Sequence, residues 1–155
     1  MLEYISELAR LMDRTLTIEI SADSEARQVR PRSRLVSTVF SNMIRNVSQH
    51  AGSNPTVEIM VKLQSDLLEV IFCDDGPGIP IQFRSVIFEK GFTTKGGAGM
   101  GLYLTKSIID HLGGTIELID LVDRDGCAFR LLIPIQRIDK EELEYSRVLR
   151  LGPRN

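Results

Sequence analysis

Apolar residues follow a helical spacing in two stretches of the chain. Between positions 35 and 50 they recur three and four residues apart, which places them on one face of a helix: Leu35, Val36, Val39, Phe40, Met43, Ile44 and Val47. Residues 101–113 show a similar pattern, which stops at two consecutive glycines, a common helix end. The spacing therefore predicts helices over 35–50 and 101–113. Shorter helices are expected at 2–12, 81–89 and 139–150.

Five other segments have the pattern of strands. Residues 15–21 alternate apolar and polar side chains, and residues 56–63 and 67–73 are apolar segments joined by a connection short enough for a hairpin. Residues 115–122 and 127–135 flank the turn sequence DRDG. This order of helices and strands predicts an α+β fold. It is a two-layer α/β sandwich in which helices pack on one face of a mixed, largely antiparallel sheet.

The composition is that of one globular domain. The chain has 155 residues, of which 43% are hydrophobic and 26% charged, so it can bury a core. Its net charge of −2 argues against a nucleic-acid-binding surface. No apolar run approaches the roughly 20 residues of a membrane span, and the N-terminus lacks the layout of a secretory signal. We therefore expect a cytoplasmic domain without membrane contact, with Cys73 and Cys127 as reduced core thiols rather than a disulfide.

An acidic and glycine-rich segment follows the strand predicted at 67–73. It reads Asp-Asp-Gly-Pro-Gly over residues 74–78, and the glycines allow the backbone to lie close to a ligand. Asp74 comes at the end of a buried strand, where an unpaired carboxylate is costly, so a ligand amine such as that of adenine is a suitable partner. A tight turn with two solvated acids is equally compatible with this segment.

A second glycine cluster, residues 96–101, precedes the helix predicted at 101–113. Backbone N–H groups at a helix start bind phosphate well. Just before this cluster, Thr93, Thr94 and Lys95 add two hydroxyls and a cation. A glycine loop without a ligand remains the alternative.

Two common phosphate-binding motifs are absent. Lys106 and Ser107 follow Thr105 rather than the glycine of a P-loop. A dinucleotide fingerprint that starts at Gly76 would need its last glycine at Ile81. The segment is therefore neither a P-loop nor a Rossmann motif.

The helix predicted at 35–50 carries a pair of amides. Asn42 and Asn46 are four residues apart and share a face. Magnesium prefers oxygen ligands and retains several waters when it bridges phosphates, so one amide oxygen from this helix would suffice. A solvated polar face is the alternative for two asparagines considered alone.

Taken in order, these segments resemble the ATP-binding catalytic domain of sensor histidine kinases, in the superfamily shared with gyrase B, Hsp90 and MutL. Residues 39–51 resemble the N box of that family, 74–80 its first glycine box, 86–95 its F box and 96–102 its second glycine box. The resemblance covers about residues 15–135 and implies a Bergerat-type ATP-binding fold.

The resemblance also implies a domain division. Residues 15–136 are the expected catalytic domain, residues 1–14 the possible end of a dimerisation and phosphotransfer helix, and residues 137–155 a C-terminal helical tail. Neither His50 nor His111 stands in the H-[DE]-x-x-x-P setting of a phosphoacceptor. The acceptor histidine is therefore expected on a dimerisation domain outside this chain.

The implied site binds ATP and Mg²⁺. Asp74 would accept a hydrogen bond from the adenine amine, Asn46 would coordinate the metal, and Asn42 and Lys95 would act at the phosphates as catalytic residues. The full set of implied nucleotide-binding residues is Asn42, Asn46, Asp74, Gly76, Gly78, Ile79, Phe88, Phe92, Thr94, Lys95, Gly97, Gly99, Met100, Gly101 and Leu102.

Position 42 discriminates within the superfamily. The hydrolytic relatives and the anti-sigma serine kinases carry a glutamate here, which can activate water or a hydroxyl as a base, whereas the amide of Asn42 cannot take a proton at neutral pH. An imidazole needs no such base. The resemblance thus implies a protein-histidine kinase that donates the γ-phosphoryl group to a histidine, for relay to a response regulator. An ATPase of the same superfamily and a non-catalytic, ATP-dependent interaction module are the alternatives.

The chain lacks one positive charge that the family pattern usually has. Gln49 stands where the family usually has a lysine that touches phosphate, and Lys95 and Arg45 are the candidates to replace that cation. The predicted lid between Phe92 and Gly97 is short, similar to that of nitrogen-regulator kinases.

Overall fold

The computed structural model describes residues 17–24, 34–50, 55–94, 96–121 and 125–135 of the chain. Its elements are β1 (Thr17–Ala22), α2 (Arg34–His50), β2 (Thr56–Gln64), β3 (Leu67–Asp74), the 3₁₀ turn η2 (Ile81–Phe83), α3 (Gly101–His111), β4 (Thr115–Ile119) and β5 (Cys127–Pro134). The helices predicted at 2–12 and 139–150, and the segments 1–14 and 137–155 of the predicted domain division, lie outside the described residues. Within those residues, no helix is long and apolar enough to cross a bilayer.

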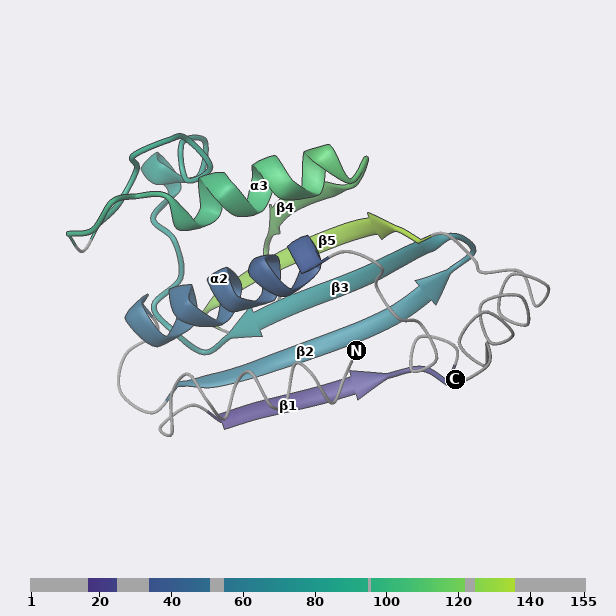
Figure 1. Cartoon of the computed structure of the whole chain (residues 1–155). Helices are drawn as coiled ribbons and strands as arrows, with labels where there is room; N and C mark the ends of the chain where they lie inside the picture. Colours follow the sequence, from purple (N-terminus) through teal and green to yellow (C-terminus); the bar gives the residue numbers. More distant parts are fainter. Residues whose placement is uncertain (1–16, 25–33, 51–54, 95, 122–124, 136–155) are drawn as a thin grey trace, which may run out of the picture.

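The five described strands form one sheet in the order β1-β2-β3-β5-β4. β1 runs parallel to β2, whereas β2–β3, β3–β5 and β5–β4 are antiparallel pairs. Figure 1 shows α2 and α3 over the same face of this sheet. The prediction of a two-layer sandwich with a mixed, largely antiparallel sheet is therefore confirmed, and so is the hairpin of β2 and β3.

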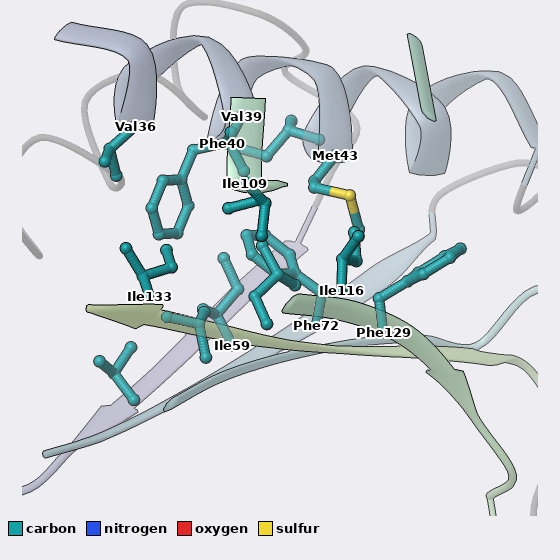
Figure 2. Close-up of a cluster of buried hydrophobic side chains, with 14 of the residues drawn as sticks. Val36, Val39, Phe40, Met43, Ile59, Phe72, Ile109, Ile116, Phe129 and Ile133 are labelled. Atoms are coloured by element: carbon teal, nitrogen blue, oxygen red, sulfur yellow. The ribbon is translucent and has the colours of Figure 1, made fainter. Parts of the chain in front are cut away.

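The core lies between the helices and the sheet because both present apolar side chains to that layer. Val57, Ile59 and Val61 alternate along β2 and are buried, as a strand with one covered face requires. Figure 2 shows Val36, Phe40 and Met43 of α2 pointing onto the side chains of the sheet. The rings of Phe40 and Phe72 lie 5.3 Å apart between their centroids and join α2 to the central strand β3. The helical stripe predicted from the sequence is thus the contact face of α2.

The prediction of a helix over residues 81–89 is wrong. After the single 3₁₀ turn of η2, successive turns are held by hydrogen bonds from the N–H of one residue to the carbonyl three residues earlier, such as Val86 to Phe83 at 3.0 Å. The aromatic residues of this segment face different partners. Phe83 packs on Phe92, and Phe88 packs edge-on against Phe129 of β5. Side chains that contact such different partners within six residues do not lie on one face of a helix.

The two cysteines occupy opposite faces of the sheet. Cys73 is paired with Ala128, and Cys127 is paired with Asp74, so the strand register places the two thiols one residue out of step. Because consecutive side chains of a strand point to opposite faces, the two sulfurs cannot form a disulfide in this register. Both are free and buried, in agreement with the expected reduced thiols.

We expect Phe72→Ala to destabilise the domain by about 3–5 kcal/mol, because it leaves a cavity where α2 meets β3. Urea unfolding followed by circular dichroism measures this change. Ile81→Ala is the matched control, because that side chain is 82% exposed, and it should change the free energy of unfolding by less than about 0.5 kcal/mol. Equal effects of the two variants would contradict the core described above.

Candidate functional site

A cavity of about 580 Å³ opens between α2, the end of β3, the glycine-rich loops and the start of α3. Its volume is in the range of small-molecule sites. The sequence-predicted residues that line it are Asn42, Asn46, Asp74, Gly78, Ile79, Phe92, Thr94, Gly97, Gly99, Met100, Gly101 and Leu102. Segments that are far apart in the sequence are therefore brought to one site.

Three predicted site residues do not line the cavity or cannot be placed. Gly76 is buried beneath the turn, and its N–H donates a hydrogen bond to Oδ1 of Asp74 at 3.0 Å. Phe88 packs on Phe129, with 6.2 Å between the ring centroids. Lys95 lies outside the described residues. Gly76 and Phe88 thus support the residues that line the cavity.

The side-chain amides of Asn42 and Asn46 on α2 lack partners among the described residues. Nδ2 of Asn42 and Nδ2 of Asn46 are buried, and neither donates a hydrogen bond to any described residue. A buried donor without an acceptor costs free energy, so such groups call for an explanation. Both residues line the cavity, where a bound group can supply the missing contacts.

Asn46 also lies against the first residue of α3. A Cβ atom at Gly101 would come within 3.1 Å of Oδ1 of Asn46, closer than side chains normally pack. Glycine at 101 therefore allows α3 to begin next to the amide without crowding it. The oxygen of this amide is the kind of ligand that a hard cation requires.

The two adjacent acids have separate roles. Asp74 is half-buried, and this burial raises the pKa of its carboxyl group above the ordinary value; the neighbouring Asp75 raises that pKa further, while the Gly76 N–H lowers it. Asp75 turns elsewhere, and its Oδ1 accepts a hydrogen bond from the backbone N–H of Thr56 at 2.9 Å. Asp75 thus ties the start of β2 to the turn, which leaves Asp74 as the acid of the cavity.

Close backbone contacts hold the turn after β3. Gly78 has a φ of +73°, and a Cβ at this position would lie 2.8 Å from the carbonyl oxygen of Gly126. Gly126 in turn packs against the carbonyl of Asp74, with a φ of +124°. Both glycines are therefore required by the fold itself. The predicted role of Gly78 in admitting a base stays a prediction.

The glycine loop between β3 and α3 has a narrow neck. The N–H of Gly91 donates to the carbonyl of Gly99 at 3.0 Å, so the ends of segment 92–98 are held together. Gly99 has a φ of +61°, and a Cβ there would overlap the Gly91 carbonyl and lie 2.7 Å from the nitrogen of Phe92. Phe92 anchors this end of the loop on Phe83, with 5.5 Å between the ring centroids. We call segment 92–98 the lid and the pair Gly91–Gly99 its neck.

A comparison with known families agrees with this geometry. The family described as histidine kinase-, DNA gyrase B-, and HSP90-like ATPase matches residues 32–137. The chain belongs to this family. The resemblance inferred from the four sequence boxes is thereby confirmed.

Named relatives within this ATPase family are sensor kinases. The chain is 33% identical over 119 residues to the sensor histidine kinase DcuS of Escherichia coli K12, which covers 74% of this chain and 22% of DcuS. It is 29% identical over 170 residues to the histidine kinase/phosphatase NtrB of Rhizobium leguminosarum bv. phaseoli, covering 98% of this chain and 44% of NtrB. Among the curated relatives compared, the chain spans 17–44% of their length.

Solved structures share the ATPase fold. The catalytic domain of histidine kinase ThkA superimposes with a TM-score of 0.74 at 27% identity, over 86% of this chain and 91% of that one. A structure of ThkA in complex with the response regulator TrrA superimposes with a TM-score of 0.71 at 25% identity, over 88% of this chain and 40% of that one.

Several residues that line the cavity of this ATPase-family domain were not among the predicted site residues. They are Met43, Arg45, Val47, Gln49, His50, Phe72, Pro77, Pro80, Phe83, Ile87, Thr93, Gly96, Ala98, Leu104, Cys127 and Phe129.

Cys127 is opposite Asp74 in the β3–β5 pair, a position that only the strand order reveals. Burial, together with the charge of Asp74, raises the pKa of the Cys127 thiol to about 12, so it stays protonated. Arg45, which directly precedes Asn46 on the same helix, had been named only as a candidate replacement for the cation missing at Gln49.

An exposed arginine supports the turn after β3 from outside. Nε of Arg84 donates to the carbonyl of Ile79 at 3.1 Å, and its guanidinium forms an ion pair with Asp120. Both partners are solvent-exposed, so this pair contributes orientation more than stability. Ile79 is held at the cavity wall by this contact.

We expect Gly99→Ala to destabilise the domain by at least about 1–2 kcal/mol, the cost of a left-handed conformation for a residue with a Cβ. The overlap with Gly91 adds to this cost. Gly97→Ala is the control, because a Cβ there finds only Thr93 Oγ1 at 4.0 Å. Urea unfolding without added nucleotide compares the two variants. A Gly99→Ala variant as stable as Gly97→Ala would refute the description of the neck.

We expect Asp74→Asn to stabilise the ligand-free domain at neutral pH. An acid whose pKa is raised on folding favours the folded state while it is protonated, and this contribution is lost as the pH rises through the raised pKa. The asparagine avoids that loss and keeps an oxygen for the Gly76 N–H. Thermal unfolding from about pH 3.5 to pH 7.5 should show the advantage of the variant shrinking with acidification. A variant less stable than wild type at neutral pH would contradict this account.

Proposed function

We propose that this domain binds Mg-ATP in the cavity and donates the γ-phosphoryl group to a histidine on a dimerisation domain outside the chain. From there the phosphoryl group passes to a response regulator in the cytoplasm. The observation that carries the proposal is the set of polar side chains that line the cavity. Two unpartnered amides lie on α2, and among the described lining residues Asp74 supplies the only carboxylate.

Asp74 suits the adenine end of the nucleotide. Its carboxylate is half-buried, and its charged form is disfavoured by that burial, so an N–H donor from a ligand would stabilise it. The adenine amine is such a donor. Ile79, Met100 and Leu102 line the same cavity with apolar side chains suited to the faces of a base.

Asn46 and the start of α3 suit the phosphate end. The Asn46 amide would hold Mg²⁺, which when bound neutralises phosphate charge and orients the oxygens of the transferred group. The first N–H groups of α3 have no carbonyl partner within the helix and can donate to phosphate oxygens. Thr94, on the lid, lines the cavity nearby and can add a hydroxyl.

Asn42 sets the choice between transfer and hydrolysis. Its amide lies one helical turn before Asn46 and cannot accept a proton at neutral pH. Water therefore finds no base on this part of α2, whereas a neutral imidazole needs none. Phosphoryl transfer depends mainly on positioning and charge neutralisation, which the amides and the α3 start are placed to supply.

We infer the kinds of partner from the related proteins. ThkA was crystallised with a response regulator, and DcuS and NtrB are named as sensor kinases. We assign the same two kinds of partner to this domain: a histidine-bearing dimerisation domain and a response-regulator receiver domain.

The proposal predicts that Asn46→Ala lowers phosphoryl transfer by at least about tenfold, through loss of the metal-holding amide. The domain is mixed with a histidine-bearing dimerisation domain, of the same protein or supplied in trans, with Mg²⁺ and γ-labelled ATP, and phosphohistidine is counted. Ser48→Ala is the control on the same helix, because its hydroxyl bonds to the Ile44 carbonyl at 3.2 Å and does not line the cavity. It should transfer at the wild-type rate.

Other outcomes of this experiment identify the alternatives. Release of inorganic phosphate without label on the histidine would indicate an ATPase. Bound ATP with neither transfer nor release would indicate an interaction module. Equal transfer by Asn46→Ala and Ser48→Ala would remove Asn46 from the mechanism.

A further inference from the structure

The described lining of the cavity contains few charges for a ligand as anionic as a nucleoside triphosphate. It holds one guanidinium, Arg45, and one carboxylate, Asp74, with His50 as a further titratable group. Gln49, which also lines the cavity, is neutral. Arg45 is thus the one permanently cationic side chain among the described lining residues.

Arg45 is placed to serve the polyphosphate end. It lies on α2 directly before Asn46, three residues after Asn42 and four before Gln49. Residues three and four apart on a helix are neighbours, so the guanidinium can cover the space beside both Asn42 and Gln49. The charge missing at Gln49 can therefore be supplied from one turn earlier on the same helix.

The guanidinium of Arg45 is also uncommitted. Arg84 is paired with Asp120, and Arg130 bonds to the buried Glu69 at 2.6 Å. Arg45 is exposed and forms no ion pair with any residue in the described part of the chain. No carboxylate there competes with a phosphate for its donors.

We propose that Arg45 binds the polyphosphate of the nucleotide and supplies the cation that Gln49 does not. A guanidinium donates two parallel hydrogen bonds to phosphate oxygens and stays charged at every relevant pH. This inference rests on the proposed function, because it needs a nucleotide in the cavity. It adds a phosphate-binding residue that the four sequence boxes do not assign.

The test measures dissociation constants of the full 155-residue chain for Mg-ATP and for adenosine by titration calorimetry. Arg45→Gln should weaken Mg-ATP binding by about tenfold to a hundredfold, the range of hydrogen bonds to charged groups, and leave adenosine binding unchanged. The salt dependence of Mg-ATP affinity should also become shallower, because one charge contact is gone.

A second substitution tests whether a cation at position 49 can replace the one at position 45. Gln49→Lys placed in the Arg45→Gln variant should restore most of the lost Mg-ATP affinity, because the cation returns to the same face of α2. Lys62→Gln is the matched control for net charge. Lys62 is exposed on β2 and does not line the cavity, so its loss should leave both affinities unchanged.

Three results would overturn the inference. Arg45→Gln binding Mg-ATP as tightly as wild type excludes a phosphate contact. Equal losses for Mg-ATP and adenosine indicate a structural defect. An equal loss of Mg-ATP affinity in Lys62→Gln indicates an effect of net charge alone. In all three cases the wild-type chain still binds nucleotide, so the proposed function stands, whereas a wild-type chain that binds neither ligand overturns both.

Discussion

The contact between Asn46 and the first residue of α3 fixes the geometry of the cavity. Because Gly101 has no side chain, α3 can begin where a Cβ would come within 3.1 Å of the Asn46 oxygen. This contact brings the N–H groups of the α3 start and the amides of α2 to the same place. The lid is joined to α3 through Gly99 and Met100, so the position of its C-terminal end depends on that of the helix start. A residue with a Cβ at 101 would require the Asn46 amide or the helix start to shift by a few tenths of an ångström.

A second set of backbone contacts fixes the opposite end of the cavity. Gly126 lies against the carbonyl of Asp74, and Gly78 lies against the carbonyl of Gly126. The turn after β3 therefore lies in close contact with the start of β5, where Cys127 is paired with Asp74. The protonated thiol and the half-buried carboxyl group form the floor of this end. One end of the cavity thus depends on a glycine next to a side-chain amide, and the other on glycines next to backbone carbonyls.

The sequence predicted those parts of the fold that depend on local periodicity. The stripe of α2 and the alternation of β2 each follow from which face meets the core, and the predicted cluster of Asn42, Asn46 and Asp74 does reach one cavity. The segment 81–89 was mispredicted because its aromatic residues anchor on different elements. The place of Cys127 depends on the order of β3 and β5, and the need for glycine at 78 depends on a carbonyl 48 positions later. Such contacts between distant segments leave no periodic signal.

The site lowers the stability of the ligand-free domain. Two buried amide NH2 groups without acceptors in the described part of the chain, and a carboxyl group with a raised pKa, each cost free energy that an apolar or fully bonded arrangement would not. The packed layer of Phe40, Phe72 and their neighbours offsets these costs from outside the cavity. Any ligand that satisfies the amides and the carboxylate binds only the folded state, so its binding energy adds directly to the stability of the fold. The same unsatisfied groups that make the empty cavity costly therefore couple nucleotide binding to the order of α2, α3 and the lid between them.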